Sequence, residues 1–139
     1  MGRVLAIDYG TKRVGLAVSD PLKLIANRLD TIRTYNIFEF LKEYLSKEVV
    51  DCFVVGFPKR LDNEPSEAQK YVSIFLKQLS KLFPEIPVYL MDERFTSKIA
   101  ARSMIEAGLK KKDRQNKALI DSISATILLQ NYLDLIKNK

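Results

Sequence analysis

Histidine is absent from this 139-residue chain, and cysteine occurs only once. Without histidine there is no imidazole to act as a general base, to bind zinc, or to activate a serine or cysteine nucleophile. Cys52 cannot form a disulfide within the chain, and its apolar neighbours Phe53, Val54 and Val55 predict a buried core position in a reducing compartment. Any catalysis must therefore use carboxylates, lysines, hydroxyls or a bound metal ion.

Long apolar runs are also missing. No run approaches the roughly 18 residues that a membrane span needs, and the N-terminus lacks the apolar segment of a signal peptide. We therefore expect a cytoplasmic protein that has no contact with membranes. Internal repeats and linker-like segments are absent too. With 47% hydrophobic residues, the chain is expected to form one domain over residues 1–139 with a substantial core.

Positive charge is in excess. Lysine and arginine number 23 against 17 aspartates and glutamates, which leaves a net charge of +6. An excess of this kind favours binding to a polyanion such as a nucleic acid. The alternative interpretation is that the lysines serve only solubility.

The hydrophobic pattern predicts an α/β fold. Alternating or continuous apolar runs predict strands at 3–8, 13–19, 27–34, 49–55 and 86–91, the last two buried. Helical spacing predicts helices from Asn36 to about 48, from Ser66 to about 82, from Thr96 or Ser97 to Gly108, and from about 117 to 136. We expect a mixed five-stranded sheet, an antiparallel three-strand meander plus two parallel strands, with helices on both faces. Gly10 is expected to adopt a positive φ in the first turn.

Carboxylates stand at three points of this scheme. Asp8 ends the first strand, Asp92 and Glu93 end the last strand, and Asp121 opens the terminal helix. Asp121 shares a helical stripe with apolar residues, so it is expected to face the sheet. The stripe consists of Asp121, Ala125, Leu128, Tyr132 and Leu135.

Three carboxylates in one crevice repel one another unless a divalent cation neutralises them. Oxygen ligands without histidine or cysteine favour Mg²⁺ or Mn²⁺, and two such ions can support phosphodiester hydrolysis. Each acid also has a simpler interpretation: a turn residue for Asp8, a surface ion pair with Arg94 or Lys98 for Asp92 or Glu93, and a favourable position in the first helical turn for Asp121.

Basic side chains flank the same predicted edge of the sheet, where they could contact phosphates. A solvated loop is the alternative explanation for the lysine run. The candidate nucleic-acid-binding residues are Lys12, Arg13, Lys59, Arg60, Arg94, Lys98, Lys110, Lys111, Lys112 and Arg114.

Four motifs together resemble the RuvX (YqgF) family over nearly the whole chain. They are the segment from Ala6 to Asp20, Val54-Val55-Gly56-Phe57-Pro58, the segment from Asp92 to Ser97, and Ile120-Asp121-Ser122 with Ala125 and the segment from Ile127 to Gln130. The resemblance implies an RNase H-like fold and a divalent-metal-dependent nuclease. That family comprises Holliday junction resolvases that are mostly regarded as nucleases maturing the 5′ end of pre-16S ribosomal RNA.

The resemblance also implies that Asp8, Glu93 and Asp121 are the catalytic, metal-binding acids, with Mg²⁺ or Mn²⁺ as the cofactor. Glu93 is preferred to Asp92, and because neighbouring strand residues point to opposite faces, only one of the two should reach the site if the strand is regular. The related RuvC resolvases carry a glutamate where this chain has Gly56, so the acid of the last strand would have to substitute for it. Asn63 also stands near a glycine that is usual in the family.

Three functions compete at this stage. The leading hypothesis is a nuclease acting on structured nucleic acid, pre-rRNA rather than branched DNA, as a monomer or a weak homodimer. The segment Asp8-Tyr9-Gly10-Thr11 also resembles the phosphate-binding hairpin of sugar kinases and actin-like ATPases, which need two such domains. The third hypothesis is a ribosome-assembly factor that binds RNA without cleaving it.

Overall fold

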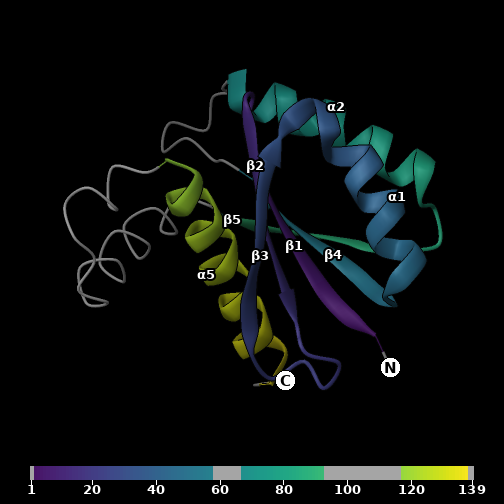
Figure 1. The fold of residues 1–139 in the computed structure, drawn as a ribbon, viewed down its shortest axis with the longest axis vertical. Helices are drawn as coiled ribbons and strands as arrows, with labels where there is room; N and C mark the ends of the chain where they lie inside the picture. Colours follow the sequence, from purple (N-terminus) through teal and green to yellow (C-terminus); the bar gives the residue numbers. More distant parts are fainter. Residues whose placement is uncertain (1, 58–66, 93–116, 138–139) are drawn as a thin grey trace.

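The computed structural model describes residues 2–57, 67–92 and 117–137. The elements in chain order are β1 (Arg3–Tyr9), β2 (Arg13–Ser19), β3 (Ala26–Arg33), the 3₁₀ turn η1 (Thr34–Asn36), α1 (Ile37–Lys47), β4 (Val50–Phe57), α2 (Glu67–Leu82), β5 (Val88–Asp92) and α5 (Lys117–Lys137). The strands form one sheet in the order β3-β2-β1-β4-β5. β1, β2 and β3 pair antiparallel, whereas β4 lies parallel to both β1 and β5. The predicted mixed five-stranded α/β sheet is therefore confirmed (Figure 1).

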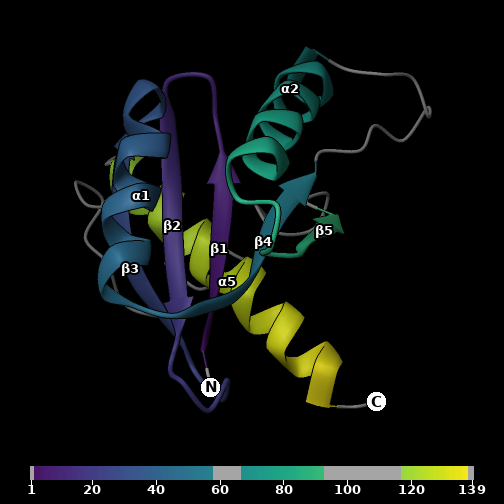
Figure 2. The same ribbon diagram turned by 90° about the vertical axis from the view of Figure 1, so that its right-hand side faces the viewer.

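The sheet separates two hydrophobic clusters. Successive residues of a strand point to opposite faces, so Leu5 and Ile7 pack with residues of α1 and α2. Val4 and Ala6 instead pack against α5 on the other face. Figures 1 and 2 show α5 on one side of the sheet and α1 and α2 on the other. Helices thus cover both faces, as the sequence predicts.

The predicted buried character of the last strand is wrong. β5 spans Val88–Asp92, and its Tyr89 and Leu90 are about half exposed. The reason is that β5 is an edge strand with β4 as its one neighbour in the sheet. Leu82, the last residue of α2, is exposed as well.

The buried stripe of α5 differs from the predicted one at its C-terminal end. Ala125 and Leu128 are buried as expected, but Leu129 and Leu133 complete the stripe and Leu135 is exposed. The prediction spaced residues by sevens, and an α-helix drifts by about 20° for every seven residues. Two such steps move Leu135 away from the sheet.

Two local predictions are corrected as well. Asn36 occupies the N-cap position of α1 but makes no capping bond with its side chain, because its backbone (φ −97°, ψ 1°) is not in the extended conformation typical of an N-cap. Gly10 does not have a positive φ. A Cβ there would lie 2.5 Å from the Arg13 carbonyl oxygen, which accepts a hydrogen bond from the Gly10 amide at 3.0 Å. Glycine is needed for this close approach.

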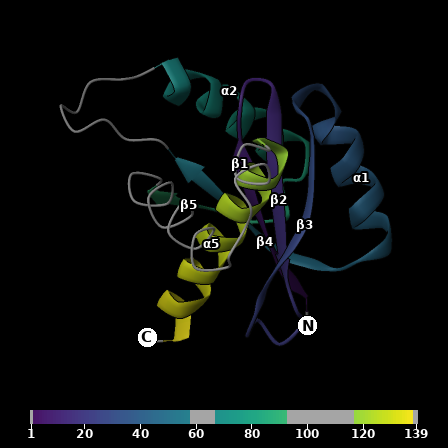
Figure 3. The same ribbon diagram turned by 60° about the vertical axis from the view of Figure 1, so that its left-hand side comes forward.

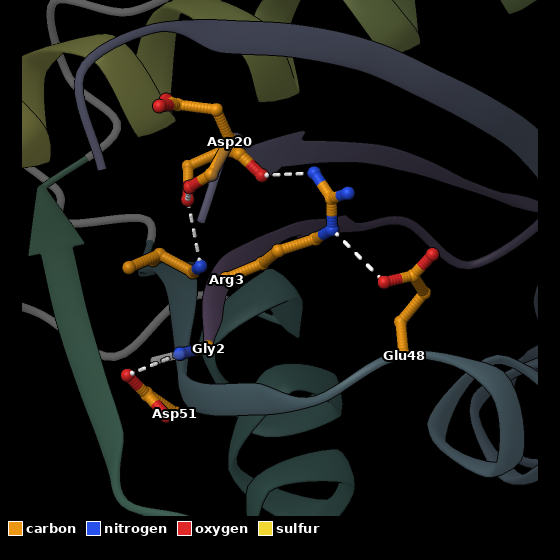
Figure 4. A network of polar contacts seen from close by, with 7 residues as sticks. Gly2, Arg3, Asp20, Glu48 and Asp51 are labelled. Atoms are coloured by element: carbon orange, nitrogen blue, oxygen red, sulfur yellow. Dashed lines mark hydrogen bonds and ion pairs between the residues drawn. The ribbon is translucent and has the colours of Figure 1, made fainter. Parts of the chain in front are cut away.

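Polar contacts tie down the start of β1 (Figure 4). The Arg3 side chain donates to Glu48 at 3.2 Å and to the Ser19 carbonyl at 3.0 Å, and the Gly2 amide donates to Asp51 at 3.1 Å. The buried Ser19 hydroxyl accepts a hydrogen bond from the Val4 amide at 2.8 Å. These contacts join β1 to β2 and β4 at the end of β1 opposite to Asp8.

Cys52 is buried, as predicted. Burial raises the pKa of its thiol above the usual range, so the sulfur stays protonated and is a poor nucleophile. Among the helices in the described part of the chain, none combines the length and the apolar character needed to cross a bilayer.

Candidate active site

The candidate site lies where β1 ends and β2 begins. β1, β4 and β5 are parallel, so their carboxyl ends share one edge of the sheet, the edge at which open α/β sheets bind ligands. Asp8 is the penultimate residue of β1. By the alternation that directs Val4 and Ala6 to α5, Asp8 also belongs to the α5 face. Its side chain is partly buried.

Gly15 brings Asp8 and the beginning of α5 together. It is the residue of β2 that pairs with Asp8 of β1. A Cβ atom at Gly15 would collide with the backbone carbonyl of Asp121 and would lie 3.2 Å from the Ser122 nitrogen. The backbone of α5 therefore rests directly on the glycine beside Asp8. Figure 3 shows the first turns of α5 lying over β1 and β2. The structure thus brings two of the three predicted acids to one place.

A guanidinium group neutralises the second acid. Arg13 Nε donates to Asp121 Oδ2 at 2.8 Å, and the two side chains are 30% and 28% exposed. Arg13 lies two residues before Gly15, so both belong to the α5 face of β2. Sequence reasoning placed Arg13 among the phosphate-contacting residues and missed this ion pair.

The simpler interpretation of Asp121 is wrong. α5 begins at Lys117, and its first turn contains no acidic residue. Because the field of a helix dipole falls off within the first turn, it gives little stabilisation to the fifth residue. Asp121 contacts the sheet and Arg13 instead.

The acids of the last strand divide between described and undescribed residues. Tyr89 stacks on Tyr132 of α5, and Met91 packs in the α5 cluster, so these two define the α5 face of β5. Asp92, the next residue, belongs to the opposite face. Glu93 lies outside the described residues. Within the described ranges, no three His, Cys, Asp or Glu side chains cluster closely enough for a metal ion.

The two acids that are described suit a hard divalent cation. Asp8 and Asp121 supply carboxylate oxygens, the ligand type that Mg²⁺ and Mn²⁺ prefer. They belong to the same face at the same sheet edge, on either side of Gly15. The Arg13 guanidinium on Asp121 shows that this place already accepts positive charge.

The candidate nucleic-acid-binding residues are only partly described. Lys12 is exposed in the turn between β1 and β2, and Arg13 begins β2. The remaining candidates lie outside the described residues: Lys59, Arg60, Arg94, Lys98, Lys110, Lys111, Lys112 and Arg114.

Sequence reasoning missed Gly15. An isolated glycine inside a strand pattern, a recognised sign of close backbone approach, was the available signal.

Comparison with known proteins decides the family. A model of the RuvX family, described as Holliday junction resolvase, matches residues 2–135. The chain belongs to the RuvX family. A RuvX relative from Bacteroides thetaiotaomicron is 57% identical over 96% of this chain and 97% of its own length, and one from Porphyromonas gingivalis is 52% identical over the same shares. Each bears the name "Putative pre-16S rRNA nuclease".

Solved structures show the fold of this RuvX chain. Thermus thermophilus RuvC in complex with a Holliday junction substrate is similar with a TM-score of 0.59 and 20% identity over 96% of each chain. A second structure of RuvC from the same organism gives a TM-score of 0.55 and 16% identity, covering 98% of this chain and 96% of RuvC. The fold is RNase H-like, as the motifs imply.

Proposed function

We propose that this RuvX chain is a divalent-metal-dependent nuclease that hydrolyses phosphodiester bonds in structured nucleic acid. The convergence of Asp8 and Asp121 on the two sides of Gly15 carries the proposal. Both positions lie at the carboxyl edge of an RNase H-like sheet, where ligands bind in open α/β sheets, and Arg13 and the exposed Lys12 lie beside them. Membership of a family described as Holliday junction resolvase supports the same reaction class.

Asp8, Glu93 and Asp121 are the proposed ligands of Mg²⁺ or Mn²⁺. Tyr89 and Met91 define the α5 face of β5. Asp92, the last residue of β5, belongs to the other face, which disfavours it as a ligand. The choice of Glu93 therefore rests on the family resemblance and on the position of Asp92.

Bound divalent cations would lower the pKa of a water molecule and stabilise the leaving oxygen. Asp8 and Asp121 would hold these ions with their carboxylates. Arg13 forms an ion pair with Asp121. With the carboxylate neutralised, its guanidinium can turn to a substrate phosphate, for which its planar donor fork is suited. Lys12 at the adjacent turn can contact a neighbouring phosphate.

Pre-16S ribosomal RNA is the proposed substrate, and maturation of its 5′ end is the proposed role. Relatives that are more than 50% identical over nearly their whole length bear the name "Putative pre-16S rRNA nuclease", which supports the substrate. The second candidate substrate is a four-way DNA junction, which the family description favours. Cleavage assays with both substrates separate the two.

The Asp8→Asn variant tests the proposal. It removes one negative charge and keeps the size of the side chain, so we expect Mg²⁺-dependent cleavage of a pre-16S rRNA fragment to fall by at least about 100-fold. The matched control is Asp30→Asn, which makes the same change at an exposed position of edge strand β3. Circular dichroism and thermal melting establish that both variants are folded.

Unchanged cleavage by folded Asp8→Asn would overturn the assignment of Asp8. A wild-type chain that binds the RNA in EDTA, yet cleaves neither RNA nor junction with Mg²⁺ or Mn²⁺, would replace the nuclease by a non-cleaving assembly factor. If the chain cleaved only the DNA junction, the proposed reaction would stand and the proposed RNA substrate would be wrong.

A further inference from the structure

A hollow opens on the other side of the β1–β2 turn from Asp8. It has a volume of about 680 Å³, within the usual size range of small-ligand sites. Tyr9, Lys12, Arg33 and Tyr35 are among its lining residues. Tyr9 follows Asp8 directly, so the two side chains belong to opposite faces of β1. The hollow therefore adjoins the candidate active site along the backbone but lies on the α1 and α2 side of the sheet, where Figure 2 shows the turn beside the beginning of α1.

Hydrogen bonds hold the walls of this hollow in place. The Thr34 hydroxyl donates to the Gly10 carbonyl at 2.7 Å, and the Thr34 amide donates to the Lys12 carbonyl at 3.1 Å. These bonds fasten the β1–β2 turn to η1, the short segment that carries Tyr35. Tyr9 stacks on Phe75 of α2 with ring centroids 4.2 Å apart, which gives the hollow a fixed aromatic floor. The hollow is thus preformed.

The lining combines an exposed aromatic ring with two cations. Tyr35 is 82% exposed, the most exposed of the large apolar and aromatic side chains in the described part of the chain. Lys12 and Arg33 are exposed, and neither forms a salt bridge with another described residue. Among the described residues, none that lines the hollow is acidic. An exposed ring offers a stacking surface to a base, and uncompensated cations offer contacts to phosphates.

We propose that this hollow, here called the Tyr35 pocket, binds a nucleotide of a single-stranded segment next to the cleaved bond. The base stacks on Tyr35, and Lys12 and Arg33 contact the flanking phosphates. Lys12 lies at the tip of the β1–β2 turn, between the Asp8 face and the Tyr35 pocket, so one strand can pass from one to the other around it. The pocket rests on the proposed nuclease function, because it makes the substrate a structured nucleic acid with an unpaired flank.

Other occupants fit the lining less well. A phosphate ion alone would leave the Tyr35 ring without a role. An apolar partner would have to cover two unpaired cations, and burying unpaired charge is costly. A free nucleotide presents the same chemistry as a nucleotide within a strand, so the experiment includes it as a separate arm.

Binding is measured with the Asp8→Asn variant in EDTA, so that the oligonucleotide is not cleaved during the measurement. The probe is a fluorescein-labelled single-stranded oligoribonucleotide followed by anisotropy. Tyr35→Ala is expected to weaken binding by about 5- to 100-fold, the loss of one base–aromatic stack. Tyr35→Phe should bind like the parent because it keeps the ring. A blunt duplex of the same sequence should be insensitive to Tyr35→Ala, because its bases are already stacked.

The cations are tested through salt dependence. Lys12→Ala should reduce the slope of log Kd against log salt by about 0.7, the value for one phosphate contact to a single strand, whereas Tyr35→Ala should leave that slope unchanged. Arg33→Ala should weaken binding more than the matched control Arg28→Ala, an exposed arginine near the other end of β3. Since these side chains are exposed, thermal melting should be close to that of the parent for all variants.

Several results would overturn the Tyr35 pocket. They are parent-like binding by Tyr35→Ala, a defect in Tyr35→Phe as large as that in Tyr35→Ala, or a labelled mononucleotide binding as tightly as the oligonucleotide. If any of these results were found while cleavage still depended on Asp8, the Tyr35 pocket would be refuted and the proposed nuclease function would stand. Loss of oligonucleotide binding in Tyr35→Ala, together with unchanged cleavage by Asp8→Asn, would keep the pocket and refute the proposed catalytic site.

Discussion

Replacing Gly15 by alanine tests whether the contact of α5 with the sheet positions Asp121. The added Cβ would collide with the Asp121 carbonyl, which is backbone and cannot rotate away like the end of a long side chain. Gly15 does not have a positive φ, so alanine introduces no backbone strain of its own. The collision can be relieved only by moving α5 away from β2.

The size of the effect follows from opposing contributions. Overpacking a close contact costs about 1–3 kcal/mol in the free energy of unfolding. Alanine also restricts the unfolded chain more than glycine does, which returns about 0.4–1 kcal/mol. We therefore expect a net loss of about 1–2 kcal/mol. The loss of activity should be larger than this destabilisation implies, because a displacement of about 1 Å at a catalytic group can reduce the rate about 100-fold.

Urea unfolding gives the stability, and Mg²⁺-dependent cleavage under conditions where the variant is fully folded gives the activity. The control is Leu79→Ala in α2, which removes a buried side chain from the cluster on the opposite face of the sheet. It should cost about 2–5 kcal/mol of unfolding free energy and leave the activity per folded molecule near that of the wild type. The two variants thus separate loss of stability from displacement of Asp121.

Full activity in folded Gly15→Ala would refute this reasoning. So would a stability equal to that of the wild type, since it would mean that α5 can shift without strain. If Leu79→Ala lost activity in the same proportion as Gly15→Ala, the effect would come from general loosening of the fold and not from the site.

Three further predictions follow from individual contacts. Arg13→Ala removes the cation that would compete with a metal ion for the Asp121 carboxylate, so Mn²⁺ should bind more tightly in a calorimetric titration. Loss of this partly exposed ion pair should change the free energy of unfolding by less than about 1 kcal/mol. Ser19→Ala leaves the buried Val4 amide without its acceptor and should lower the urea unfolding free energy by about 1–3 kcal/mol. Burial raises the pKa of Tyr132 to about 12, whereas a tyrosine in the unfolded chain titrates near pH 10. The free energy of unfolding should therefore fall between about pH 10 and 12. Tyr132→Phe should make that fall smaller when urea midpoints are measured across this pH range.

Much of the sheet could be predicted because its strands have a clear period. β2 spans the predicted residues 13–19, and β1 exceeds its prediction by Tyr9 alone. The burial of β5 could not be predicted in the same way. An apolar run looks alike in a central strand and in an edge strand, and the position at the edge depends on which strands pair. That pairing is a property of the whole chain.

The sequence allowed candidate site residues to be selected, but not the contacts that these residues make. Aspartate at a strand end and on an apolar helix face is a local signal, so Asp8 and Asp121 could be selected from the sequence. The ion pair between Arg13 and Asp121 joins residues distant in the chain, and no local pattern announces it. The same holds for the Tyr35 pocket, because Thr34 and the β1–β2 turn meet only after β3 has paired with β2. The catalytic and metal-binding roles of Asp8, Glu93 and Asp121, and the nucleic-acid contacts of all the basic candidates, stay predictions.

Arg13 gives the site a consistent electrostatic order of events. The Arg13 guanidinium, whose Nε lies 2.8 Å from Asp121 Oδ2, neutralises one of the two carboxylates that we propose as metal ligands. A cation bound by both carboxylates would compete with this contact, which would weaken metal binding by the free protein. A substrate phosphate offers Arg13 a new partner and so reduces that competition. Metal and nucleic acid should therefore bind cooperatively, and removing the Arg13 side chain should abolish much of that cooperativity.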